Sequence, residues 1–115
     1  LARERGYQTV AIGSTDLTHY GPNYGFSPMG TGTPALDWVT KKNDPAFIEK
    51  VLAMDPEGML DEGLAHYNAC CSGAAATAVA AGKKLGATRG QLIAYDTSHA
   101  KSPGQSFVGY AGVVF

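Results

Sequence analysis

The sequence predicts a layered α/β domain, and three patterns support this fold class. An apolar run at residues 8–13 has the composition of a strand covered on both faces. Patterns typical of helices follow between residues 33 and 85. Two more strand-like runs, at residues 91–95 and 107–115, come after the last helix. Because strands bury their apolar faces against helices, this order favours a sheet with helices packed on it.

The helical region is divided by residue pairs that begin helices. Thr33-Pro34, Asp44-Pro45 and Asp55-Pro56 each combine an N-cap residue with a first-turn proline, which predicts three short helices in series. The alanine-rich run at residues 72–85 predicts a fourth helix, and its small side chains predict close approach of neighbouring backbone. Residues 1–6 resemble the last turn of a helix, so we expect the chain to be a piece of a longer protein.

Composition limits the classes of partner. The 115 residues are expected to form one domain, residues 1–115, with nine Lys and Arg against ten Asp and Glu. No basic stripe is present, so nucleic acid is not an expected partner. No apolar run reaches the length of about 20 residues that spans a bilayer, so no membrane interaction is expected. The two adjacent cysteines cannot form a disulfide framework, which favours the reducing cytoplasm.

A carboxylate and an imidazole follow the first predicted strand. Asp16 and His19 lie three residues apart in Ser-Thr-Asp-Leu-Thr-His-Tyr, just before a loop rich in Gly and Pro. Ligands bind at the carboxyl ends of strands in α/β sheets, where such a pair can share a proton, hold a metal or polarise a substrate. The alternative is structural: Asp16 caps the turn and His19 bonds a loop carbonyl.

Cys71 directly precedes the alanine-rich helix. The positive end of a helix stabilises a thiolate, which is both a nucleophile and a soft metal ligand. The alternative is a small buried cysteine that packs under the helix. Since adjacent cysteines seldom point the same way, we expect only one at a site, with Cys70 as filler. His66 and His99 are weaker candidates, because a single histidine in such a setting is more often solvated or hydrogen-bonded.

The order of these segments resembles a known family. The Asp16–His19 block comes first, Asn-Ala-Cys-Cys-Ser at residues 68–72 follows, and Val-Gly-Tyr-Ala at residues 108–111 closes the chain. Together they resemble the C-terminal half of the Memo family, whose prokaryotic members are called AmmeMemoRadiSam system protein B. The resemblance covers essentially the whole chain.

The resemblance implies a LigB-like fold, that of class III extradiol dioxygenases: α/β/α layers around a mixed sheet. It implies a non-haem iron or copper site with Cys71 as metal ligand and Asp16 and His19 as catalytic residues beside it. Two histidine ligands would come from an N-terminal half that this chain lacks. The chain departs from the family at Ser72, where Gly is usual, which leaves open whether Cys70 or Cys71 is the ligand. It also has His99-Ala100 in place of Gly-Asp, so His99 is a candidate additional ligand.

Three functions follow as hypotheses. The first is a metal-binding protein, with extradiol-type dioxygenase or other redox activity on an unknown substrate. The second is a cysteine-nucleophile enzyme, since Cys-Ser-Gly-Ala-Ala-Ala locally resembles thiolase-type condensing enzymes. The third is a non-catalytic scaffold module with AMMECR-type and radical-SAM partners, which the resemblance implies. Because a domain without part of its sheet exposes edges, we also expect association with the missing half or with a second copy.

Overall fold

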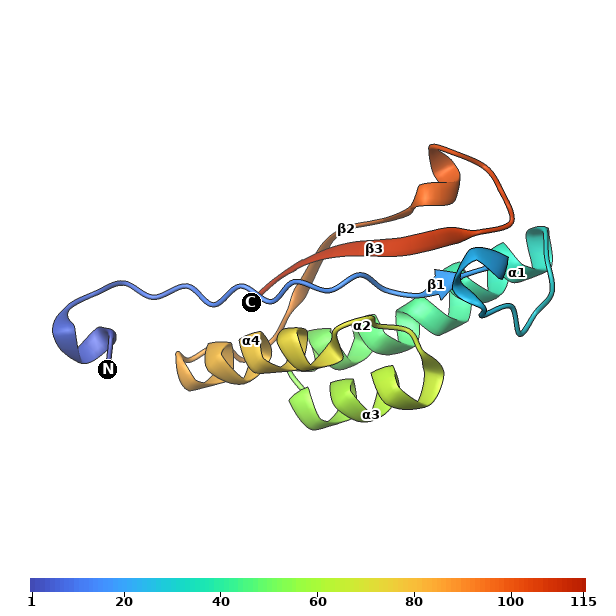
Figure 1. The fold of residues 1–115 in the computed structure, drawn as a ribbon. Coiled ribbons are helices and arrows are strands. Elements are labelled where there is room, and N and C mark those ends of the chain that lie inside the picture. The colour runs from blue at the N-terminus through green and yellow to red at the C-terminus, as the bar shows by residue number, and fades with distance from the viewer.

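A computed structural model describes all 115 residues and confirms the α/β class. Its sheet has three strands in the order β1-β3-β2, with β1 at His19–Tyr20, β2 at Gln91–Thr97 and β3 at Phe107–Val114. Both pairings are antiparallel, where the resemblance implied a mixed sheet. The helices lie on one face of the sheet (Figure 1), so the described residues form two layers. No helix has the length and apolar character needed to cross a membrane.

The helices begin close to the predicted positions. Their bounds are α1 Thr33–Trp38, α2 Asp44–Leu52, α3 Pro56–His66 and α4 Ser72–Lys84. At α3 the Asp55 side chain accepts a hydrogen bond from the Gly58 N–H at 3.0 Å, as an N-cap should. The separation predicted between the first two helices is wrong, because a π-helical stretch, Val39–Asn43, joins α1 to α2 without a break.

The core has two parts. The larger is built around Phe47 and Val51 of α2, Met59 of α3 and Val79 of α4. The smaller surrounds the fully buried ring of Tyr20, on which the glycine- and proline-rich loop folds. In that loop the Met29 N–H donates to the Tyr20 hydroxyl, which itself donates to the Gly30 carbonyl, both at 2.9 Å. These bonds place the loop beside β1, where the Asp16–His19 segment ends.

The strand predicted at residues 8–13 is absent. Residues 7–18, which we call the arm, run extended before β1 without belonging to any regular element (Figure 1). Val10 and Ile12 are 82% and 88% exposed, although their pattern predicted burial. The physical reason is that residues 8–15 make no backbone hydrogen bond to any other segment. An extended segment without a neighbour is not a strand.

Two glycines of β3 provide a matched test of packing. A Cβ at Gly109 would collide with the buried Asp44 carboxylate, whereas one at Gly112 would meet nothing within 4 Å. Gly109→Ala should therefore lower the free energy of unfolding by about 1–3 kcal/mol. Gly112→Ala should change it by less than about 1 kcal/mol. Urea denaturation of both variants measures the difference, and equal stabilities would contradict the packing described here.

Candidate functional site

The Asp16–His19 segment is held by its two middle residues. The Leu17 N–H donates to the Gly109 carbonyl at 3.0 Å, and the Gly109 N–H donates to the Thr18 carbonyl at 3.1 Å. Leu17 and Thr18 are buried, at 4% and 0% exposure. The outer residues, Asp16 and His19, keep partly exposed side chains. The backbone of β3 thus fixes the middle of the segment and leaves its carboxylate and imidazole free for chemistry.

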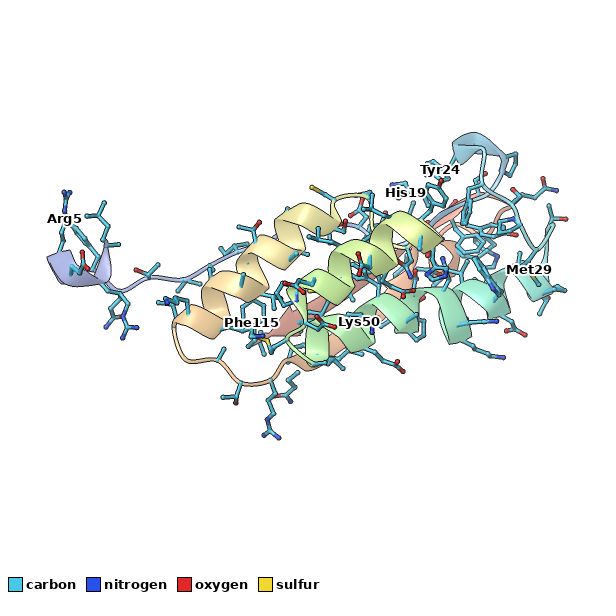
Figure 2. The ribbon with its side chains drawn as sticks, turned by 90° about the horizontal axis from the view of Figure 1, so that it is seen from below. Arg5, His19, Tyr24, Met29, Lys50 and Phe115 are labelled. Atoms are coloured by element: carbon cyan, nitrogen blue, oxygen red, sulfur yellow. The ribbon has the colours of Figure 1, made fainter.

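Asp16 and His19 face each other. The His19 Nε2 lies 3.7 Å from the Asp16 Oδ2, and the His19 Nδ1 lies 3.3 Å from the Leu17 carbonyl oxygen. Because a carbonyl only accepts, the Nδ1 is assigned the hydrogen at that contact. The Nε2 is then the nitrogen that can take up and release a proton beside the Asp16 carboxylate. The Tyr24 ring lies edge-on to the imidazole at 4.9 Å between centroids. Figure 2 shows the two labelled side chains in the same region of the molecule.

The turn before α4 is bonded to the same segment. The Asp16 N–H donates to the Cys70 Sγ at 3.4 Å, and the Cys70 N–H donates to the Asp16 carbonyl at 3.1 Å. Next to this pair, the Cys71 N–H donates to the Thr15 Oγ1 at 2.9 Å. Thr15 and Asp16 therefore hold Cys71 and Cys70 of the turn. The Cys70 sulfur is fixed within hydrogen-bond distance of the residue that faces His19.

His19 and Cys70 line one open cavity of about 760 Å³. Aromatic and apolar side chains form most of the remaining wall, including Phe26 and Tyr67, whose rings lie 5.6 Å apart. The complete lining is His19, Tyr24, Gly25, Phe26, Gly63, Leu64, Tyr67, Ala69, Cys70 and Ser72. Small-molecule sites are commonly cavities with a largely apolar wall and a few polar groups, here a thiol and an imidazole.

The other candidate residues lie outside this cavity. Cys71 is the N-cap residue of α4, and both cysteines are exposed. Cys70, which was expected to be filler, lines the cavity, and Cys71 does not. His66 lies on α3 with its Nδ1 2.8 Å from the Glu62 Oε1. His99 lies after β2, edge-on to the Phe107 ring. Cys71 as metal ligand stays a prediction.

The donors of this chain do not complete a metal site. No group of three or more His, Cys, Asp or Glu side chains is placed to hold a metal ion. The Cys70 thiol, the His19 imidazole and the Asp16 carboxylate do not converge as such a group, so residues 1–115 supply only part of a donor set.

Comparison with known proteins identifies the family. The family model "Memo-like protein" matches residues 1–114. The chain belongs to the Memo family. A MEMO1 family protein of Thermococcus kodakarensis is 34% identical over 116 residues, which cover 99% of this chain and 40% of that protein. One of Methanopyrus kandleri is 38% identical over 118 residues, 100% and 36% of the two chains. A MEMO1 family protein of Nitrosopumilus maritimus is 32% identical over 117 residues, which cover 100% of this chain and 37% of that protein.

The resemblance found in the sequence is therefore confirmed. This Memo-family chain spans about two fifths of the length of the curated relatives it matches. The matching relatives are named only by family, so their names assign no reaction, substrate or metal.

A buried acid, Asp44, was not singled out by the sequence analysis. Its Oδ1 accepts hydrogen bonds from the Thr18 N–H, at 3.0 Å, and from the Thr18 hydroxyl. Its Oδ2 accepts from the Tyr95 hydroxyl at 2.7 Å. The carboxyl is 0% exposed and has no cationic partner. In the sequence, Asp44-Pro45 predicted only the start of a helix. The one signal that Asp44 would be buried is the set of apolar residues that follow it in α2, Phe47, Ile48 and Val51.

Asparagines extend this network toward the cysteines of the Memo-family chain. The Asn43 Nδ2 donates to the Thr18 Oγ1 at 3.0 Å and to the His66 carbonyl at 3.2 Å. The Asn68 Nδ2 donates to the Asn43 carbonyl and to the Glu62 Oε1, both at 2.9 Å. Asn68 is fully buried and lies two residues before Cys70. The network therefore positions both the His19 side and the Cys70 side of the cavity.

Burial dominates the ionisation of the Asp44–Tyr95 pair. Desolvation raises the pKa of Asp44 above the ordinary 3.8, although hydrogen bonds from Thr18 and Tyr95 act in the opposite direction. Desolvation and the hydrogen bond to Asp44 raise the pKa of Tyr95. A carboxyl whose pKa is raised on folding stabilises the protein below its unfolded pKa. That stabilisation is lost as the pH rises through the folded pKa.

Asp44→Asn should remove this pH dependence. Asparagine keeps an acceptor for the Thr18 N–H and cannot ionise. The difference in free energy of unfolding, variant minus wild type, should therefore be larger at about pH 7 than at about pH 3.5, because only the wild type loses stability as the pH rises. Urea denaturation at both pH values measures it, with Asp37→Asn, at an exposed ion pair with Lys41, as the control. A wild-type-to-variant difference that is constant with pH would contradict a raised pKa.

Proposed function

We propose that this chain supplies one thiolate ligand and a proton-transfer pair to a Memo-type metal centre. Cys70 is the ligand in this proposal, and Asp16 and His19 are the pair. The observation that carries it is the Asp16 residue itself: its N–H bonds the Cys70 sulfur at 3.4 Å and its carboxylate faces the His19 Nε2 at 3.7 Å. A single residue thus holds a soft donor and a base at the edge of one cavity.

The chemistry of the donors favours a transition metal. A thiolate selects copper, zinc or iron over magnesium or calcium, which agrees with the iron or copper implied by the family resemblance. The remaining ligands would come from the part of the Memo-family length that residues 1–115 do not span. When bound, the metal would act as a Lewis acid on a substrate or on dioxygen. An extradiol-type dioxygenase or another redox reaction is the activity proposed for such a centre.

The residues of this chain have defined roles in the proposal. The contact of the His19 Nδ1 with the Leu17 carbonyl orients the ring, and the Asp16 carboxylate lies beside the Nε2 at 3.7 Å. The His19 Nε2 takes a proton from a substrate in the cavity and returns it. Tyr24, Phe26 and Tyr67 present flat apolar surfaces to the substrate side.

Paired cysteine variants test the ligand assignment. In the polypeptide as encoded, at its full length, Cys70→Ser should lower iron or copper affinity by at least about tenfold, because the sulfur donor is lost. Cys71→Ser should retain the wild-type metal content. The measurement is metal content after anaerobic loading and desalting, and circular dichroism checks the fold. Loss in Cys71→Ser alone would assign the ligand to Cys71, and retention in both variants would show that neither thiolate binds the metal.

A further inference from the structure

The cavity that contains His19 and Cys70 has no Lys or Arg side chain in its wall. A carboxylate or phosphate ligand would therefore find no cationic side chain of this kind among the lining residues. The charged groups nearest to the wall are carboxylates. Asp16 lies 3.7 Å from the imidazole of His19, and Glu62 directly precedes the lining residue Gly63. Neither carboxylate pairs with a Lys or Arg, so the charges around this cavity favour a ligand with a positive group.

Three aromatic side chains of the wall, Tyr24, Phe26 and Tyr67, can bind such a group. The ring centroids of Phe26 and Tyr67 lie 5.6 Å apart at an interplanar angle of 56°, so the rings are inclined rather than stacked and neither covers the face of the other. Phe26 is also held by the rings of Tyr20 and Trp38, with centroids 6.1 and 6.2 Å away. The face of an aromatic ring attracts a cation that lies within about 6 Å of its centroid.

The backbone of Tyr67 gives an independent indication that its ring has a role in the cavity. Tyr67 is the C-cap residue of α3 with a φ of +52°, a left-handed conformation that glycine adopts at lower cost. Met54 is the other non-glycine residue with positive φ, and its buried side chain packs in the core. The Tyr67 side chain is 67% exposed, so burial does not offset the cost of its backbone. Strained residues of this kind cluster at ligand sites.

We propose that this cavity binds an organic ammonium cation and that Tyr67 determines this specificity. The positive group would lie against the rings of Phe26 and Tyr67, and the rest of the ligand would extend toward His19 and Cys70. A volume of about 760 Å³ is in the range of small-molecule sites. Recognition of quaternary ammonium groups by several aromatic rings is an established use of this attraction. The ligand's role as a substrate rests on the proposed metal centre, whereas its binding needs no metal.

Choline and its neutral carbon isostere, dimethylbutanol, separate charge from shape. In an NMR titration of the full-length encoded polypeptide, kept in a metal chelator, choline should bind at least about tenfold more tightly than dimethylbutanol, because the aromatic faces attract only the cation. Equal affinities would show that the cavity is merely apolar, and binding of neither probe would show that it does not take this class of ligand. Tighter binding of the anion dimethylbutanoate would show the opposite charge preference. Each of these three results would overturn the proposal.

Variants of Tyr67 locate the bound cation. Tyr67→Gly removes the ring and suits the left-handed backbone, so the preference for choline should fall by about tenfold while the urea midpoint is unchanged or higher. Tyr67→Asn, a second residue type that tolerates this conformation, should give the same loss. Tyr67→Phe keeps the ring face and should keep the preference. Tyr7→Gly, at an exposed tyrosine outside the cavity, is the control and should also keep it. An unchanged preference in Tyr67→Gly or Tyr67→Asn would place the cation elsewhere and overturn the assignment.

The chelator distinguishes failure of this proposal from failure of the metal proposal. A preference for choline that depends on Tyr67, together with wild-type metal content in both cysteine variants, would overturn the metal centre and leave the ammonium site. Loss of metal in Cys70→Ser without any preference for choline would do the reverse.

Discussion

The buried carboxyl of Asp44 is the contact on which the rest of the structure depends. It joins the start of α2 to Thr18 of the arm and to Tyr95 of β2, three elements that share no regular hydrogen bonding with one another. A buried acid without a cation costs free energy unless its oxygens are bonded, and here both are. Gly109 leaves the space that this carboxyl occupies. Removing one partner would leave a buried polar group unsatisfied, which typically costs about 1–3 kcal/mol.

This contact also explains the position of the cavity residues. Thr18 is adjacent to His19, and the Asn43–Asn68 bonds carry the same network to within two residues of Cys70. The two sides of the cavity are therefore fixed by buried groups that do not line it. A site built in this way keeps its reactive side chains exposed, because the burial that holds them is supplied by their neighbours. In this short segment, Leu17 and Thr18 are buried and hold the backbone, while the adjacent Asp16 and His19 keep exposed side chains.

Short-range sequence patterns predicted the helices. They did not predict features that depend on contacts between residues far apart in the chain. Asp55-Pro56 began α3 as expected because an N-cap acts within one turn. Asp44-Pro45 has the same local form, yet Asp44 is buried by Tyr95 of β2 and Gly109 of β3, which lie 51 and 65 residues later in the chain. That Asp16 and His19 lie side by side was predictable, because only two residues separate them in the sequence. The direction of the Cys70 sulfur was not, since it depends on the dihedral angles of an irregular turn and on bonds to Thr15 and Asp16.

The strand predicted at residues 8–13 is absent for a different reason. Its sequence has strong strand character, and its backbone is extended, so the local prediction agrees with the local conformation. What residues 8–15 of the arm lack is a backbone partner, and pairing is the one property of a strand that its own residues cannot supply. An apolar extended segment with a free edge is a strong aggregation hazard in a finished domain. The exposed Val10 and Ile12 therefore combine the composition of a strand with a backbone that is extended but unpaired.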